Sequence, residues 1–373
     1  MIEHLIERLP KSEKLTFTMV KDVLEFAKML KKTLPYSVIA YVCELSQTDT
    51  IPILERATQT QGIKLIAIVV DKNKINSIDA IAHLFSLPEN VRGIIAMHSG
   101  VLGACKYFAH YKNLPLFLLV SDGINNRLIA RKALLRISAK EPNIVDVPCE
   151  KKVYLIKDNI KSNEFIINTI ENLLCSCTCF ADYILSLAYC KEKPNEAVLG
   201  VLRDIICALN AVKESNYERL IFHALHAQVY GANINGYFSI CTCGLISQLN
   251  NASFGAYECA YVLEKYKRLF DGKANNLPNY TERARAVSFR LGIDYGVALK
   301  GIKAQIKKYA NPDLKDIEEQ FNIIYHIFTE LLSVYKALGG KIENFGDLSV
   351  IALSGDTPLG INGMSLLREK YVV

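Results

Sequence analysis

A short corner in the first half of the chain carries residue types that hold phosphate groups in many enzymes. The stretch MHSGVLGACK follows an apolar run and contains His98, Ser99, Gly100 and Lys106. Small residues between a strand and a helix let the backbone approach a pyrophosphate, while N–H groups of the first helical turn point at it. With only Gly100 and Gly103 present, the motif alone is more typical of a tight connection than of a cofactor turn.

Histidines and cysteines elsewhere offer other candidates. His223 and His226 stand three residues apart on a predicted helix, so they could face one side and approach a metal, or simply lie on a partly buried helix. The chain has 11 cysteines without the regular spacing of a disulfide framework, which indicates thiols in a reducing compartment. The CSCTC cluster at 175–179 has C-x-C spacing in a helical context, so its thiols point in different directions. These cysteines are predicted to act as small hydrophobes rather than as metal ligands.

The elements that would position the corner alternate along residues 1–160. Apolar runs of strand length are separated by segments of helical period, which is typical of a parallel sheet covered by helices. The predicted strands are Tyr36–Val42, Lys64–Val70, Arg92–Met97, Leu116–Val120 and Lys151–Ile156. We therefore expect an N-terminal α/β domain of the Rossmann-like kind.

Residues 161–373 contain amphipathic segments of helical length, separated by glycines and prolines. The predicted helices are Glu164–Leu174, Phe180–Lys191, Glu196–Lys213, Tyr217–Tyr230, Ala256–Phe270, Thr281–Leu291, Tyr295–Tyr309 and Leu314–Leu338. The second domain is predicted to be helical, and a cleft between the two domains is the expected place for a small molecule.

Composition excludes some classes of partner. The chain has 373 residues, 50% of them hydrophobic, and its net charge of +6 comes from 44 basic and 38 acidic residues spread along the sequence. Clustered basic residues with interleaved aromatics are missing, so we expect no nucleic acid partner. No window has the uncharged apolar length of a membrane span, and the charged first residues do not fit a signal peptide. A cytoplasmic protein that does not bind membranes is predicted.

The whole order of segments is more specific than the corner. A parallel α/β half with the MHSGVLGACK corner, a strand ending in LVSDG and an all-helical half resemble the dehydroquinate synthase-like and iron-containing alcohol dehydrogenase superfamily. The glycerol-1-phosphate and glycerol dehydrogenase branch is the nearest in pattern. The resemblance implies a nucleotide-binding domain followed by a metal and substrate domain, NAD or NADP as cofactor, a small-molecule substrate, and a homo-oligomer.

The family motif at the corner is matched in part. The family pattern is G-G-G-T-x-x-D-x-x-K. In this chain Met97 to Gly100 stand in place of G-G-G-T, Gly103 stands at the acidic position, and the lysine is retained as Lys106. The family's V-P-T after the next strand becomes Val120-Ser121-Asp122. The cofactor-binding residues that the resemblance implies are His98, Ser99, Gly100, Lys106, Ser121 and Asp122.

The metal ligands of the family are also matched in part. The segment CFADYILSLA puts Asp182 at the position of an aspartate ligand, Tyr257 stands at the position of a histidine, and Asn279 at that of a second histidine. Glu258 could coordinate after a shift of one residue. A catalytic zinc or iron prefers about three imidazole or carboxylate ligands. Without such a metal, either another group activates the substrate or the chain does not catalyse the family's reaction.

Three functions remain open. The first is a divergent NAD(P)-dependent dehydrogenase for a small polyol or its phosphate, with a non-standard or missing metal site. The second is a catalytically degenerate member that acts as a binding or assembly protein. The third is a lyase of the dehydroquinate synthase type, which needs the same metal and basic phosphate contacts.

Overall fold

The chain forms two compact units, which divide between Thr169 and Ile170. The computed structural model describes residues 17–71, 77–97, 99–121, 123–124, 128, 132–135, 143–147, 151–190, 196–233, 256–271, 281, 285, 294–297, 299–300 and 314–342. The predicted helices Thr281–Leu291 and Tyr295–Tyr309 lie largely outside these residues.

The first unit is built on a sheet of six parallel strands in the order β1-β8-β5-β4-β2-β3. Its strands are β1 (Thr18–Val20), β2 (Val38–Glu44), β3 (Lys64–Val70), β4 (Val91–Ala96), β5 (Leu116–Val120) and β8 (Lys151–Ile156). An antiparallel hairpin of β6 (Lys132–Leu135) and β7 (Asn143–Asp146) is separate from it. The central strand β5 reads LFLLV and is buried throughout, as expected for a parallel strand covered on both faces. The predicted Rossmann-like parallel sheet is confirmed.

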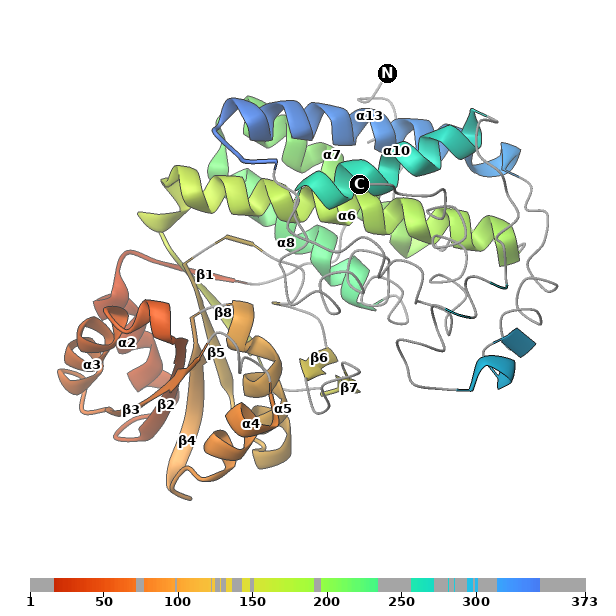
Figure 1. Ribbon diagram of the computed structural model, residues 1–373. Coiled ribbons are helices and arrows are strands. Elements are labelled where there is room, and N and C mark those ends of the chain that lie inside the picture. The colour runs from red at the N-terminus through yellow and green to blue at the C-terminus, as the bar shows by residue number, and fades with distance from the viewer. Residues whose placement is uncertain are drawn as a thin grey trace. The chain divides into compact units, whose positions relative to one another are not determined.

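Four helices connect these strands: α2 (Val23–Thr33), α3 (Thr50–Gln59), α4 (Ile78–Phe85) and α5 (Leu102–Lys112). In the part of this unit that the structure describes, short 3₁₀ turns accompany them at η1 (Leu45–Gln47), η3 (Ser99–Val101) and η4 (Asn159–Lys161). Helices α2 and α3 pack together on one face of the sheet, and α4 and α5 pack together on the other (Figure 1). The start of α2 is set by Asp22, whose carboxylate accepts from Glu25 N–H at 2.8 Å, while Lys21 N–H donates to Glu25 Oε2 at 2.6 Å. The Asp22 carboxylate thus satisfies an N–H that the first turn of the helix leaves open, and Glu25 in turn binds the N–H of the residue before the cap.

The loop after β5 is held by the first turns of helix α6 (Asn163–Cys190). Ile124 N–H donates to Thr169 Oγ1 at 3.1 Å, and that hydroxyl donates to Phe165 O at 2.8 Å. Gly123 adopts a φ of +117°, and a Cβ there would lie 2.8 Å from the Cβ of Asn168. Only glycine fits this close approach in this backbone conformation.

The second unit is helical within the described residues. Its helices are the remainder of α6, then α7 (Glu196–Lys213), α8 (Tyr217–Asn233), α10 (Ala256–Phe270) and α13 (Lys315–Ala337). Helix α7 packs along α8, and α13 packs against both α7 and α10. The predicted helical second domain is confirmed for these segments. Among the described residues, none of the helices combines the length and the apolar run that a membrane span needs.

Helix α6 corrects one prediction. Two separate segments, Glu164–Leu174 and Phe180–Lys191, were expected, but a single helix of 28 residues runs through the CSCTC cluster. The hydroxyl groups between the two predicted segments form hydrogen bonds within the helix: Thr178 Oγ1 donates to Leu174 O at 3.1 Å, and Ser176 Oγ donates to Asn172 O at 2.9 Å. Cys177 is fully buried, so the cluster contributes to the core instead of interrupting the helix.

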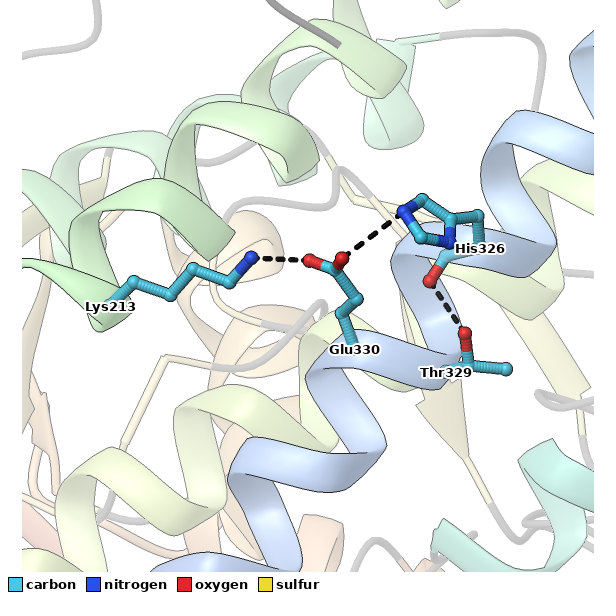
Figure 2. Close-up of polar contacts among 4 residues, drawn as sticks. All are labelled: Lys213, His326, Thr329 and Glu330. Atoms are coloured by element: carbon cyan, nitrogen blue, oxygen red, sulfur yellow. Dashed lines mark hydrogen bonds and ion pairs between the residues drawn. The ribbon is translucent and has the colours of Figure 1, made fainter. Parts of the chain in front are cut away.

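A polar link joins the end of α7 to α13. Lys213 donates to a carboxylate oxygen of Glu330, and His326 Nε2 lies 3.1 Å from the other oxygen (Figure 2). Thr329 Oγ1 donates to His326 O at 2.7 Å one turn away. The hydrogen bond from Lys213 lowers the pKa of Glu330. Because these side chains are partly exposed, such a pair contributes at most about 1 kcal/mol.

The tight loop at Gly123 gives a stability prediction. Gly123→Ala should destabilise the protein by about 1–3 kcal/mol, because the alanine meets both a left-handed φ and a Cβ contact of 2.8 Å. Gly339→Ala is the matched control, since Gly339 has a φ of +91° with nothing within 4 Å of an added Cβ. Urea unfolding of the two variants measures the difference. Equal losses would show that the contact with Asn168 is unimportant.

Candidate functional site

The direction of the strands selects one edge of the sheet as the candidate site. All six strands are parallel, so their carboxyl ends lie along one edge. From β2 the chain passes to β3 on one side, and then returns through α4 to β4 on the other side of β2. In open α/β sheets, ligands bind outside the carboxyl ends of the strands where the strand order reverses. Here that position lies between the ends of β2 and β4.

The corner after β4 faces this position with small residues. Ser99 and Gly100 begin η3, which starts three residues after the last residue of β4, and α5 follows from Leu102 with no side-chain cap from Val101. The positive end of the helix dipole favours an anion near this first turn. A strand-to-helix corner of small residues is the kind of place where proteins bind anions.

A buried hydroxyl ties together the segments around the corner. Tyr41 of β2 is fully buried, and its hydroxyl lies 2.6 Å from Thr50 Oγ1 at the start of α3. Thr50 Oγ1 donates its hydrogen to Gln47 O at 2.6 Å, so the Tyr41 hydroxyl donates to Thr50. Met97 Sδ, just after β4, is a second acceptor at 3.3 Å. Burial raises the pKa of Tyr41 to about 12, so this hydroxyl keeps its proton at neutral pH.

Two other polar residues lie at the carboxyl ends of strands beside the corner. Glu44 is the last residue of β2 and is buried at 8% exposure. Ser121 follows β5, and its Oγ donates to Met97 O at 3.5 Å, a long hydrogen bond across the ends of β4 and β5. The candidate site thus joins the ends of three neighbouring strands.

The structure describes some of the predicted cofactor-binding residues and not others. Ser99 and Gly100 lie in η3 and Ser121 after β5, whereas His98 and Asp122 are outside the described residues. Lys106 lies in a packed segment: Leu102 to Lys106 are all buried, and Lys106 is 1% exposed. A buried ammonium must be paired, so this lysine is part of the packed interior of α5. Its role toward a cofactor stays a prediction.

The predicted metal residues give a poor donor set. Asp182 lies in α6, and Tyr257 and Glu258 lie in α10, while Asn279 is outside the described residues. For Asp182 and Glu258 the structure describes the helical backbone but not the side chain. In the described part of the chain, no group of three histidine, cysteine or acidic side chains could hold a metal ion. A phenol and an amide are weak substitutes for imidazole, so these residues do not fit a catalytic zinc or iron.

The two histidines of α8 have different partners. His223 Nδ1 lies 2.8 Å from Asp204 Oδ1, and Asp204 is fully buried in α7. One turn on, His226 is 2% exposed, with its ring centroid 4.1 Å from that of Phe222. Burial lowers the pKa of His226. The structure therefore supports the interpretation of these histidines as members of a partly buried helix.

The described cysteines are buried thiols, as the sequence predicted. They are Cys43, Cys105, Cys175, Cys177, Cys179, Cys207 and Cys259. Burial raises the pKa of Cys177, which keeps the thiol protonated and unreactive.

Sequence reasoning missed Tyr41, Thr50 and Asp204. Tyr41 sits in an apolar strand where an aromatic residue is unremarkable, and Thr50 contacts it only through the fold. Asp204 had a visible signal, since it is an acidic residue within the apolar helical segment DIICAL. An acid in such a place needs a buried partner, which is His223.

The comparisons with known proteins define the class of fold. No family model matches the sequence, and no curated protein matches it. An iron-containing alcohol dehydrogenase of known structure matches with a TM-score of 0.50 and 12% identity, over 97% of this chain and 99% of that one. This likeness is one of fold, and it confirms the fold that the sequence resemblance implied.

Two further solved structures are similar. One is the NADH-dependent butanol dehydrogenase A from Thermotoga maritima, with a TM-score of 0.49, 15% identity, and coverage of 96% of this chain and 100% of that one. The other is the glycerol dehydrogenase from Schizosaccharomyces pombe, with a TM-score of 0.48, 13% identity, and coverage of 91% and 96%.

The buried hydroxyl under the corner gives a testable prediction. Tyr41→Phe removes the donor to Thr50 and Met97, so it should reduce stability by about 1–2 kcal/mol through the lost hydrogen bond. Tyr36→Phe is the control, because the Tyr36 side chain is 82% exposed and its loss of a hydroxyl should cost little. Denaturant unfolding of both variants checks this, and a Tyr41→Phe protein as stable as the control contradicts it.

The lowered pKa of His226 sets a direction for stability against pH. The unfolded histidine binds its proton near pH 6.5, whereas the buried one resists it, so the unfolded state binds more protons at low pH. Stability should therefore fall as pH drops below about 6.5. His226→Gln should flatten that decline in melts between pH 5 and pH 8, while His326→Gln, at a side chain 57% exposed, should keep it. A decline that survives His226→Gln unchanged would exclude this histidine as its source.

Proposed function

We propose that this chain binds a nicotinamide dinucleotide at the carboxyl edge of its parallel sheet and is a divergent oxidoreductase for a small polyol or polyol phosphate. The observation that carries the proposal is the Ser99–Gly100 corner, which leads into α5 where the strand order reverses. This is the place and the chemistry that hold a pyrophosphate in dinucleotide-binding folds.

The residues of the corner have separate tasks in this proposal. N–H groups of η3 and the first turn of α5 hold the pyrophosphate, and Gly100 lets the backbone approach it. The Tyr41 hydroxyl keeps the ends of β2 and β4 in register beneath the site. A nicotinamide held by these groups would accept or supply the hydride. No step through a metal is assigned, because the donor set of Asp182, Tyr257 and Asn279 does not fit one.

The end of β2 favours NAD over NADP. Glu44 is the last residue of this strand, next to the corner across the reversal of strand order. An acidic residue at such a strand end accepts hydrogen bonds from ribose hydroxyls and repels a 2′-phosphate. We therefore assign NAD as the cofactor.

The experiment is a thermal melt of the full chain with NADH, NADPH and zinc in separate titrations. NADH at a hundredfold excess over its dissociation constant should add about 2.7 kcal/mol, a rise of several degrees in Tm, and NADPH should add less. Gly100→Glu should remove the NADH effect, because a carboxylate would occupy the phosphate position. Lys112→Glu, at the other end of α5, is the matched control and should leave the effect intact.

Two outcomes decide against the proposal. No shift with either nucleotide would exclude a dinucleotide site. A shift that Gly100→Glu leaves unchanged would place the nucleotide away from the corner.

A second function is favoured by one observation. Tyr257 of α10 stands at the position where the resembling family has a histidine ligand, so the metal-dependent chemistry of that family lacks a donor here. A catalytically inactive binding protein would keep the nucleotide effect on melting but consume no NADH with any polyol or carbonyl substrate. Turnover of NADH by the purified protein would exclude this alternative.

A further inference from the structure

Tyr36 lies at the amino-terminal edge of the parallel sheet, opposite the edge that carries the proposed cofactor site. It precedes β2, it has a left-handed φ of 50°, and its side chain is 82% exposed. Such a φ is unfavourable for a bulky residue, and strained backbone of this kind gathers at functional positions. The ring is held on its own unit, because Lys31 Nζ lies 5.9 Å from the ring centroid and a Cβ added to Gly62 would lie 3.2 Å from Tyr36 Cδ1. An exposed aromatic ring that is fixed in place is typical of an anchor in a protein interface.

Basic residues from three segments surround this ring. Lys31 and Lys32 lie in the last turn of α2, directly before Tyr36. Lys64 is the first residue of β3 and Arg92 the second residue of β4, and both strands pair with the beginning of β2. The four residues are spread along the chain from position 31 to position 92, so the sequence shows no basic cluster and the sheet alone brings them together.

The charge at this edge is predominantly positive. In the described turns and strand starts of β2, β3 and β4, the acidic side chain is that of Glu89, two residues before β4. Lys31 and Lys32 complement the negative end of the α2 dipole, as cations in a last helical turn often do. Lys64 and Arg92 begin strands, so a helix dipole does not account for them. The potential that they add attracts negatively charged groups.

We propose that the amino-edge surface, formed by Lys31, Lys32, Tyr36, Lys64 and Arg92, binds an acidic segment of a partner protein. An apolar side chain of the segment packs on the Tyr36 ring, and carboxylates on either side accept hydrogen bonds from the lysine and arginine side chains. The beginnings of β4, β2 and β3 together occupy about 10 Å, so about three residues of an extended segment reach across them.

The single ring favours a polypeptide over a nucleic acid. Single-stranded nucleic acids stack successive bases on several aromatic faces. In the amino-edge surface there is one ring, and the Lys31 ammonium already lies over it. A base stacked on that face would displace a cation that the phosphates need, whereas an apolar side chain can pack along the ring and leave Lys31 to bind a carboxylate.

The test measures the binding of a defined acidic peptide to the full chain by fluorescence anisotropy. The probe is a labelled peptide of glutamate and leucine with about ten residues, which is about 33 Å long when extended. The wild-type chain should bind it, and salt should weaken the binding. Lys32→Glu and Lys64→Glu should each reduce the affinity about tenfold, because each places a like charge against the peptide. Lys157→Glu is the matched control, since Lys157 is exposed just after β8 at the opposite edge of the same sheet, and it should leave the affinity unchanged.

Tyr36→Gly distinguishes a role in binding from a role in folding. Glycine adopts a left-handed φ without strain, so this variant should melt at about the temperature of the wild type. Its affinity for the peptide should nevertheless fall about tenfold, because the anchor is gone. An affinity that Tyr36→Gly or Lys64→Glu leaves unchanged would overturn the proposal. So would a single-stranded oligothymidylate of equal charge that binds more tightly than the peptide.

Discussion

The pairing of β2 with strands on both of its sides is the constraint on which the first unit depends. Because β2 lies between β3 and β4, the chain must leave it on one side and return on the other. That reversal puts the Ser99–Gly100 corner beside the end of β2, and it also leaves β3 at the margin of the sheet. The position of the proposed cofactor site is therefore a consequence of this topology. The Tyr41 hydroxyl reinforces the same constraint, since it connects β2 to the start of α3 and to Met97 after β4.

Much of this unit could be predicted because parallel strands buried on both faces leave a plain signal. The runs Lys64–Val70, Leu116–Val120 and Lys151–Ile156 have the predicted bounds. Strand β2 begins two residues later than predicted, because Tyr36 adopts a left-handed φ of 50° and still belongs to the turn. Strand β1 has three residues and was not predicted, since such a segment has no period to detect and exists only through its pairing with β8.

The candidate site was predicted less well than the fold, and for a physical reason. A corner of small residues can be read from a sequence, because strand, turn and helix are local. The groups that hold the corner in place are not local: Tyr41 is 56 residues from Met97, and Ser121 is 24 residues from the carbonyl that it contacts. Lys106 shows the same limit, since its place in the sequence pattern says nothing of the packing that leaves it 1% exposed.

In the helical unit, side chains that can bind metals are used to hold helices together. Asp204 and His223 form a buried polar contact between α7 and α8, and the thiol of Cys177 fills space within α6. A buried pair of this kind contributes little net energy, because desolvation offsets much of the attraction. The link of Lys213 to Glu330 lies at the surface, where an ion pair also contributes little. The Asp204 carboxylate and the His223 ring thus join α7 to α8, while most of the packing between these helices comes from apolar side chains such as Ile205, Leu209 and Leu225.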